Sequence, residues 1–286
     1  MNQFLQAGAR QINLSSPVCM GILNITPDSF SDGSQLGKSC GGRFVVNLDE
    51  ALLRAEQMVE DGATIIDIGG ESTRPGASPV SIDEEMNRVI HVISAIHARL
   101  DVCISVDTST PEVMKVAIAE GAGIVNDVRA LRRPLALDAV IDSNAAVCLM
   151  HMYGQPSNMQ QTFSYNDVVS EVYHFLSERV DFCKRRGISS ERIIVDPGFG
   201  FGKSVTHNYQ LLKKLHNFIG LQQPILVGLS RKSMIASATN RSVGDRLAGS
   251  VAATSFALLG GASIIRTHDV AATMDAIRVH SVFSNA

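Results

Sequence analysis

Several apolar runs in this sequence end in a residue that can do acid–base or ion-binding chemistry. Asp107 follows CISV, Asp196 follows IIV, and Arg266 and His268 follow SII. Runs of this kind are typical of buried strands, and the carboxyl ends of parallel strands meet at one edge. The sequence therefore predicts one polar site built from many strand ends. The strand-end residues are Asn24, Asp67, Asp107, Asn126, Asp127, His151, Asp196, Ser230, Arg231, Lys232, Arg266 and His268.

These side chains divide into two chemical groups. Asp107, Asn126 and Asp196 supply hydrogen-bond acceptors and one amide, which suits a heterocycle rich in N–H groups, such as an aminopyrimidinone. The cationic group follows the last two runs and comprises Arg231, Lys232, Arg266 and His268. Arginine binds phosphate through a planar fork and lysine as a point charge. We therefore expect a polar ring at one end of the pocket and a phosphorylated tail at the other.

A divalent metal is the third chemical expectation. Asn24 is followed closely by Asp28 and Asp32. Amide and carboxylate oxygens are the hard ligands that Mg²⁺ prefers beside a phosphate. The sequence thus predicts Mg²⁺ as a cofactor.

The glycine-rich segment DPGFGFGK (196–203) is a weaker signal. It lacks the GxxxxGK[ST] spacing of a P-loop, so it makes either an anion cradle or a tight turn after a strand. Phe199 and Phe201 are too close in sequence for one helical stripe. We expect at least one of them to form a flat wall of the pocket.

Short β-rich runs alternate along the chain with longer segments of helical periodicity. We expect strands at Val18–Leu23, Thr64–Ile68, Val102–Val106, Gly123–Asn126, Ala145–Met150, Arg192–Val195, Pro224–Leu229 and Ser263–Arg266. We expect helices at Leu48–Glu60, Ile82–Arg99, Pro111–Glu120, Pro134–Asp142, Tyr165–Arg186, His207–Phe218, Val243–Leu259 and Val270–Phe283. This order predicts an α/β fold, a (β/α)8 TIM barrel in a single domain. The alternative is a doubly wound open sheet, which the absence of GxGxxG at the first helix disfavours.

Two segments lie outside the repeating units. Residues 1–17 precede the first strand, and we expect a short N-terminal flap under a catalytic barrel of residues 18–286. Residues 34–47 form a glycine-containing insertion before the first helix, either an inert surface loop or a loop with a short strand at Phe44–Val46.

Composition excludes several classes of protein. The chain has 286 residues, a net charge of −3 and no Trp, so it has no basic field or stacking platform for nucleic acid. The longest weakly polar stretch, Val251–Ile265, is too short to span a membrane, and the N-terminus lacks the pattern of a signal peptide. Five cysteines without CxxC spacing predict buried thiols in a reducing compartment. We expect a cytoplasmic protein.

Eight segments together resemble the dihydropteroate synthase family. They are MGILNITPDSFSDG (20–33), DIGGESTRPG (67–76), ISVDTS (104–109), NDVR (126–129), LMHM (149–152), DPGFGFGK (196–203), GLSRKS (228–233) and IIRTHDV (264–270). The likeness runs along nearly the whole chain and includes every predicted strand end. The resemblance implies a (β/α)8 barrel of folate synthesis that joins (7,8-dihydropterin-6-yl)methyl diphosphate to 4-aminobenzoate. The products are 7,8-dihydropteroate and pyrophosphate.

The resemblance also implies a role for each matching residue. The pterin is expected on Asp107, Asn126, Asp196 and Lys232, and the diphosphate on Asn24, Thr73, Arg266 and His268. Mg²⁺ is expected on Asn24 and Asp32. The pocket for 4-aminobenzoate is expected to comprise Phe30, Arg74, Pro75, Phe201, Lys232 and Ser233. The resemblance further implies a homodimer and inhibition by sulfonamides.

The implied chemistry agrees with the residue types. Loss of the diphosphate in an SN1-like step leaves positive charge on the pterin and negative charge on the leaving group. Asp107 and Asp196 stabilise the first charge, and Arg266, His268 and Mg²⁺ the second. Two alternatives stay open: a methyltetrahydrofolate:corrinoid methyltransferase with a similar pterin pocket, and a catalytically silent pterin-binding paralogue.

Overall fold

The predicted strand segments form one parallel sheet that closes into a barrel. The computed structural model describes residues 3–26, 36–40, 43–72, 80–154, 159 and 163–286. The barrel strands are β3 (Val18–Asn24), β6 (Ile65–Gly69), β7 (Cys103–Asp107), β8 (Ile124–Asp127), β9 (Ala146–Met150), β10 (Ile193–Asp196), β11 (Leu226–Gly228) and β12 (Ile264–Thr267). Their order is β10-β9-β8-β7-β6-β3-β12-β11. A parallel bridge between Val195 on β10 and Ile225, which precedes β11, joins the two ends of this strand order. The sheet is therefore closed, so the expected (β/α)8 barrel is confirmed and the open sheet is excluded.

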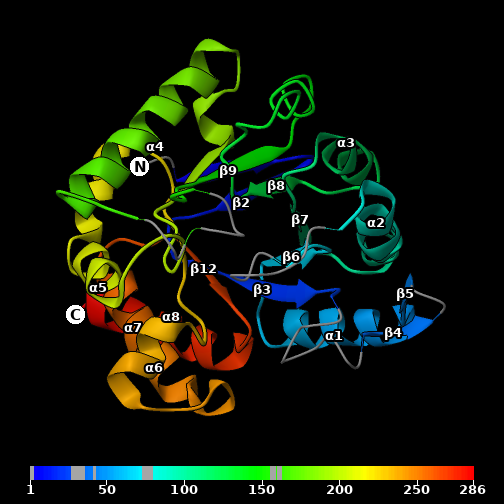
Figure 1. Ribbon diagram of the computed structural model, residues 1–286. Helices are drawn as coiled ribbons and strands as arrows, with labels where there is room; N and C mark the ends of the chain where they lie inside the picture. Colours follow the sequence, from blue (N-terminus) through cyan, green and yellow to red (C-terminus); the bar gives the residue numbers. More distant parts are fainter. Residues whose placement is uncertain (1–2, 27–35, 41–42, 73–79, 155–158, 160–162) are drawn as a thin grey trace.

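The helices form an outer ring around the strands (Figure 1). They are α1 (Leu48–Glu60), α2 (Ile82–Arg99), α3 (Pro111–Ala119), α4 (Val168–Arg185), α5 (Val205–Lys213), α6 (Ser233–Thr239), α7 (Leu247–Leu259) and α8 (Val270–Ser284). Each longer helix turns an apolar stripe toward the sheet; in α1 the buried residues are Ala51, Leu52, Ala55 and Met58. In the described ranges, no helix has the length and apolar character needed to cross a membrane.

One predicted helix is wrong. The segment Pro134–Asp142 forms consecutive turns in which Val140 and Ile141 both donate to the Leu137 carbonyl. Leu135 has φ 65°, in the left-handed region that a non-glycine residue rarely adopts, so the first helical turn cannot form there.

Other boundaries also differ from the predicted ones. The predicted helix His207–Phe218 divides into α5 and the 3₁₀ turn η2 (Leu215–Leu221), and Val243–Leu259 divides into η3 (Val243–Asp245) and α7. Helix α4 starts three residues later than the predicted Tyr165, where Asp167 accepts from the backbone N–H groups of Val169 and Ser170. Helix α6 was not predicted, because its seven residues are too few to show a period.

A hairpin covers the N-terminal end of the barrel. Strands β1 (Phe4–Ala7) and β2 (Arg10–Asn13) pair antiparallel, and Leu5, Ala7 and Ile12 are buried. They pack in one cluster with residues at the starts of the barrel strands, among them Met20 and Ile65. This packing supports our proposal of a flap over residues 1–17 under a barrel of residues 18–286.

The insertion before α1 also contains a hairpin. Strand β5 (Arg43–Val46) pairs antiparallel with β4 (Gly37–Cys40), so the predicted strand at Phe44–Val46 is confirmed. The Phe44 side chain is buried and lies under the guanidinium of Arg88 on α2. The hairpin is therefore packed against α2 through Phe44.

The cysteines in the described side chains are buried thiols. Cys19, Cys103, Cys148 and Cys183 are free and buried, as predicted. Burial raises the pKa of the Cys19 and Cys103 thiols to about 12, so neither is a nucleophile near neutral pH.

Candidate active site

A partly buried arginine lies at the centre of the polar site at the C-terminal mouth of the barrel. Arg266, on β12, donates from Nε to Asp67 Oδ2 at 2.6 Å and from Nη2 to Asp107 Oδ2 at 2.8 Å. Asp67 is the central residue of β6 and is fully buried, and Asp107 ends β7. One guanidinium therefore binds two carboxylates, from β6 and β7, which are separated from β12 by β3 in the sheet.

Asp67 and Asp107 share the single positive charge of Arg266, so the negative charge of Asp107 is only partly neutralised. Burial raises the pKa of Asp107 to about 7, with Arg266 acting against the rise and Asp67 adding to it. A carboxylate whose pKa lies near neutrality can hold either charge state under working conditions. Such perturbed groups are common where charge develops during a reaction.

Asp67 connects several residues of the site, although the sequence analysis assigned it no role of its own. Its carboxylate accepts from Ser105 Oγ at 2.6 Å and from Asn126 Nδ2 at 3.1 Å, besides Arg266. It thus fixes both the amide and the guanidinium of the site. A signal was present: Asp67 and Ser105 are register partners on β6 and β7, and each is polar within an apolar run.

The second charged pair involves Asp196 on β10 and Lys232 after β11. Asp196 Oδ1 accepts from the Gly198 N–H at 2.7 Å, and Lys232 Nζ donates to the Phe199 carbonyl. Burial lowers the pKa of Lys232 to about 8, while the Asp196 carboxylate opposes the fall. Burial raises the pKa of Asp196. The two groups are thus held at one side of the mouth.

Phe201 supplies the flat wall that the sequence predicted. Its ring centre lies 4.9 Å from Lys232 Nζ, and the ring packs against an apolar cluster made of Val128, Met150, Met152 and Met159. Phe199 instead points into the main core and is fully buried. The mouth therefore has an apolar lining beside its charges, which the sequence analysis did not identify.

A second buried lysine holds the turn that carries these residues. Lys203 Nζ donates to the carbonyls of Gly198 at 2.8 Å and Phe201 at 3.1 Å and contacts His151 Nδ1 at 2.9 Å. Burial, and then the charge of Lys203, lowers the pKa of His151 to about 2, so its neutral ring accepts this hydrogen bond. A Cβ at Gly198 (φ 70°) would lie 1.9 Å from the His151 carbonyl oxygen, so only glycine fits this turn.

The ends of β11 and β12 are joined by polar contacts. His268 Nδ1 lies 3.1 Å from Ser230 Oγ, which also accepts from the His268 N–H at 3.2 Å. Arg231 Nε donates to Asp269 Oδ2 at 3.0 Å, so this predicted phosphate ligand has a carboxylate partner. Ser233 is exposed and begins α6.

Asn24 lies at the end of β3, with its side-chain oxygen next to Gly69. A Cβ on Gly69 would lie 3.3 Å from Asn24 Oδ1 and 3.8 Å from Asp107 Oδ2, so both oxygens lie beside this glycine. The amide oxygen of Asn24 is of a type that fits Mg²⁺, which takes few protein ligands beside substrate phosphates. The described residues contain no group of three His, Cys, Asp or Glu side chains able to hold a metal by themselves.

The remaining predicted site residues lie outside the described residues. They are Asp28, Phe30, Asp32, Thr73, Arg74 and Pro75. The structure thus brings together Asp107, Asn126 and Arg266 through Asp67, and brings Asp196, Lys232 and Phe201 together through the 198–203 turn. A barrel mouth with acceptors, a flat apolar ring and cations at the last two strands suits a charged, N–H-rich heterocycle with an anionic tail.

Comparison with known proteins decides which enzyme family has this site. The family model described as "Pterin binding enzyme" matches residues 20–268. The chain belongs to the pterin-binding enzyme family. It is 48% identical over 275 residues to the dihydropteroate synthase of Escherichia coli, an alignment that covers 96% of this chain and 94% of that protein.

Solved structures of the same enzyme share the fold. The dihydropteroate synthase of Yersinia pestis, in a sulfonamide complex, matches with a TM-score of 0.93 and 45% identity and covers 99% of this chain and 100% of that chain. The enzyme of Xanthomonas albilineans with 4-aminobenzoic acid matches with a TM-score of 0.91 and 45% identity over 100% of both chains. The predicted family and function are confirmed: the chain is a transferase with dihydropteroate synthase function.

Proposed function

We propose that the barrel mouth binds (7,8-dihydropterin-6-yl)methyl diphosphate and 4-aminobenzoate and joins them into 7,8-dihydropteroate, with release of pyrophosphate. The observation that carries this proposal is the Asp67–Arg266–Asp107 cluster, which places anionic and cationic groups within one pocket. The 4-aminobenzoic acid in the Xanthomonas albilineans structure supports the choice of second substrate.

The pterin is assigned to Asp107, Asn126, Asp196 and Lys232. The two carboxylates accept from ring and amino N–H groups, while Lys232 donates to a ring acceptor. The Phe201 ring and its methionine cluster cover the apolar face of the heterocycle. This pocket is built on strand ends and on a turn fixed by Lys203, so it is preformed.

The diphosphate is assigned to Arg266 and His268, with Asn24 and Thr73 beside them. Asn24 and Asp32 would hold Mg²⁺, which would neutralise the leaving diphosphate when bound. We place Arg266 beside both the pterin cation and the diphosphate, because it contacts the carboxylate of Asp107. It therefore connects the group that stabilises the pterin cation with the group that leaves.

The bond that breaks joins the pterin methylene carbon to the diphosphate oxygen. Its electron pair leaves with the diphosphate, and the resulting cation is stabilised by Asp107 and Asp196. The amine of 4-aminobenzoate attacks the methylene carbon and then loses a proton. We assign the 4-aminobenzoate pocket, and the ring of a competing sulfonamide, to Phe30, Arg74, Pro75, Phe201, Lys232 and Ser233.

Pyrophosphate release gives the direct test of this function. We expect release to depend on 4-aminobenzoate and to match dihydropteroate formation one to one. A corrinoid methyltransferase would release no pyrophosphate, and a silent paralogue would bind the pterin without turnover. Either outcome would exclude the proposed reaction.

Replacing Asp67 with Asn is expected to move the acid limb of the activity profile to lower pH. Asp107 is neutral below its pKa of about 7, so kcat/KM that needs its carboxylate rises with pH through that value. The negative charge of Asp67 contributes to the raised pKa of Asp107. Without that charge, Asp107 is the only carboxylate that pairs with Arg266, so the pKa of Asp107 should fall. Steady-state kinetics from about pH 5 to 9 measures the midpoint. Ser105→Ala, which keeps the charge of Asp67, is the matched control and should leave the midpoint unchanged; an unmoved midpoint in Asp67→Asn would contradict the coupling.

Chelation of Mg²⁺ is expected to abolish product formation and to prevent tight binding of 4-aminobenzoate. The pterin pocket is preformed, whereas the 4-aminobenzoate pocket is assigned partly to residues on the loops after β3 and β6. We propose that these loops close over bound diphosphate and Mg²⁺. Calorimetry should show 4-aminobenzoate binding only when pyrophosphate and Mg²⁺ are present. Equal affinity for the free protein would rule out this order.

We propose a homodimer formed through α7 and α8. Helix α7 contains no charged residue, and large apolar side chains on these two adjacent helices are exposed: Leu247, Phe256, Leu259, Val279, Val282 and Phe283. An apolar surface of this kind marks an interface, and a self-complementary patch suits a two-fold dimer. We propose a cytoplasmic location, which the buried free cysteines support.

Phe256→Glu with Val279→Glu is expected to convert the dimer into a monomer, because it places charges at the centre of the apolar face. Sedimentation velocity measures the mass. Val116→Glu on α3 is the matched control, since Val116 is also exposed but lies on another helix, and it should stay dimeric. A monomeric wild-type protein would refute the interface.

A further inference from the structure

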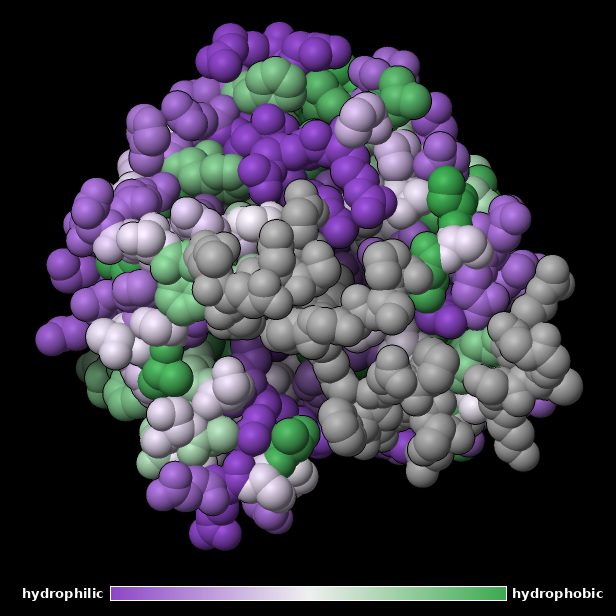
Figure 2. All heavy atoms as spheres, in the orientation of Figure 1, coloured by the Kyte–Doolittle hydropathy of each residue, from purple (hydrophilic) through white to green (hydrophobic). Residues whose placement is uncertain are grey.

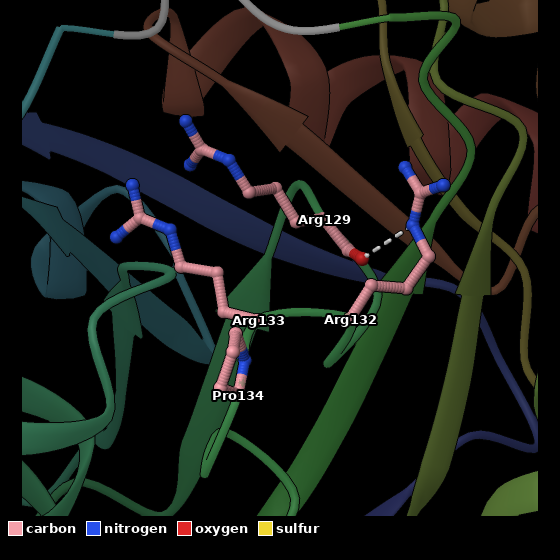
Figure 3. A pocket seen from close by; sticks show the side chains of 4 residues that line it. All are labelled: Arg129, Arg132, Arg133 and Pro134. Atoms are coloured by element: carbon pink, nitrogen blue, oxygen red, sulfur yellow. Dashed lines mark hydrogen bonds between the residues drawn. The ribbon is translucent and has the colours of Figure 1, made fainter.

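Three arginines surround a pocket beside the turn that follows β8, outside the site described above. The pocket has a volume of about 390 Å³ and is lined by Arg129, Arg132, Arg133 and Pro134 (Figure 3). This volume lies within the range of small-molecule sites. Figure 2 shows that hydrophilic side chains gather on this face near β8 and β9.

The turn that carries the arginines is held rigidly from below. The buried carboxylate of Asp127 accepts from the N–H groups of Arg129 at 2.8 Å and Leu131 at 2.7 Å, and from the Ser109 hydroxyl. Ala130 and Leu131 have φ 53° and 55°, a left-handed conformation that non-glycine residues adopt only when their surroundings impose it. The arginines are therefore presented by a fixed backbone.

Two of the arginine side chains are also fixed. Arg133 Nη1 donates to Thr110 Oγ1 at 3.1 Å, and Arg132 Nε donates to the Arg129 carbonyl at 3.1 Å. The Arg132 guanidinium lies 5.2 Å from the ring centre of Phe175. In Figure 3, Arg129 and Arg133 extend in the same direction from the turn, while Arg132 lies on the other side of Arg129.

The lining of the pocket contains three cationic side chains and no acidic one. Burial, and then the nearby charge of Arg133, lowers the pKa of Arg129. The acidic groups that act on Arg129 are Glu71, Asp127 and Glu85, and none of them is among the lining residues. Glu85 accepts hydrogen bonds from the hydroxyls of Thr108 and Thr110, and Asp127 accepts from backbone N–H groups of the turn that carries the arginines. An anion in the pocket would offset the repulsion between the guanidinium groups.

We propose that this pocket is an accessory anion site that takes a compact polyanion of the phosphate class, such as a diphosphate or a longer oligophosphate. Arginine forks match phosphate oxygens, and three guanidinium groups suit a ligand with several charges. Pro134 is the one apolar residue in the lining, so the pocket favours a small hydrophilic ligand over a large organic one. Its lining contains neither Arg266 nor His268, so we treat it as separate from the diphosphate position proposed at those two residues.

Calorimetry with inorganic pyrophosphate tests the site. We expect the wild-type chain to bind two pyrophosphate molecules. The double variant Arg129→Gln/Arg133→Gln should lose one of them, with each lost guanidinium weakening binding about 10-fold. Arg99→Gln, at the opposite end of the barrel on α2, is the matched control and should bind as the wild type does.

The result that would overturn the site is equal stoichiometry and affinity in the wild-type chain and the double variant. Arg266→Gln separates this result from a failure of the proposed catalytic site, because that variant should lose only the other pyrophosphate. Circular dichroism checks the fold of each variant. Arg133→Lys, which keeps the charge, should show intermediate affinity, and wild-type affinity there would exclude recognition through the guanidinium fork.

Kinetics distinguishes two sources of the same ligand chemistry. If the site receives the diphosphate of the incoming pterin substrate, the double variant should raise its KM about 10-fold at unchanged kcat. If it takes a free phosphate compound, KM should stay the same and any effect of added tripolyphosphate on the rate should disappear. Each of these outcomes supports the anion site, and a variant that changes neither binding nor kinetics refutes it.

Discussion

Replacing Arg266 with Gln is expected to reduce kcat/KM by about 10³-fold or more, the largest effect of any single change in the site. The variant removes the only described cation that touches both Asp67 and Asp107, and it removes a proposed ligand of the leaving diphosphate. Two buried carboxylates would then face each other without a counter-charge. The free energy of unfolding should fall by about 3 kcal/mol, as for other broken buried ion pairs.

The pH dependence of the loss of stability in Arg266→Gln distinguishes the effect of the missing charge from the effect of the changed side-chain shape. Without Arg266 the carboxylates are harder to ionise, so the variant should be less destabilised at about pH 5, where Asp107 is protonated, than at about pH 8. Denaturant unfolding at both pH values measures the difference. Arg266→Lys keeps one charge but cannot bridge two carboxylates with a fork, so it should recover stability more than activity. A variant with wild-type kcat/KM would show that the guanidinium takes no part in the reaction.

Asp107→Asn is expected to lower kcat by about 10²-fold or more, while the fold is retained. The amide has nearly the same shape but carries no negative charge for the developing pterin cation. The substitution would also leave Arg266 paired with Asp67 alone, so the position of the guanidinium should be preserved. Single-turnover kinetics isolates the chemical step, and circular dichroism checks the fold. Unaltered turnover would place the pterin cation elsewhere in the barrel.

The comparison with Asn126 sharpens this test. Asn126 is also a site residue, but its Nδ2 donates to Asp67 and it carries no charge. Asn126→Ala should therefore raise the KM of the pterin substrate more than it lowers kcat, whereas Asp107→Asn should mainly lower kcat. Equal effects of both changes on kcat would contradict the electrostatic role of Asp107.

The strand ends were predictable because each polar residue directly follows an apolar run. Asp107, Asn126, Asp196 and Arg266 all lie where the sequence placed them, at the C-terminal ends of barrel strands. In parallel strands this local pattern alone decides which residues reach the mouth. The predicted helix at Pro134–Asp142 failed because Leu135 has a left-handed backbone conformation, which the periodicity of the segment does not reveal.

The supporting residues were not predictable in the same way. Asp67 lies 199 positions from Arg266 in the sequence, and only the closed barrel brings them together. Lys203 was part of a recognised motif, but its contacts with His151 and the Gly198 carbonyl depend on the packing of two neighbouring strands. Phe199 and Phe201 are alike in sequence, and only the turn between them decides that Phe201 lies at the mouth while Phe199 enters the core.

A crystal structure of this chain with a bound dihydropterin tests the proposed site most directly. We predict that Asp107, Asn126 and Asp196 accept from or donate to the pterin ring, with Lys232 at a ring acceptor and the methylene group directed toward Arg266. The Asp67–Arg266 contact should persist in the complex. A pterin bound away from these strand ends, with none of the three side chains within hydrogen-bond distance, would contradict the proposed mechanism.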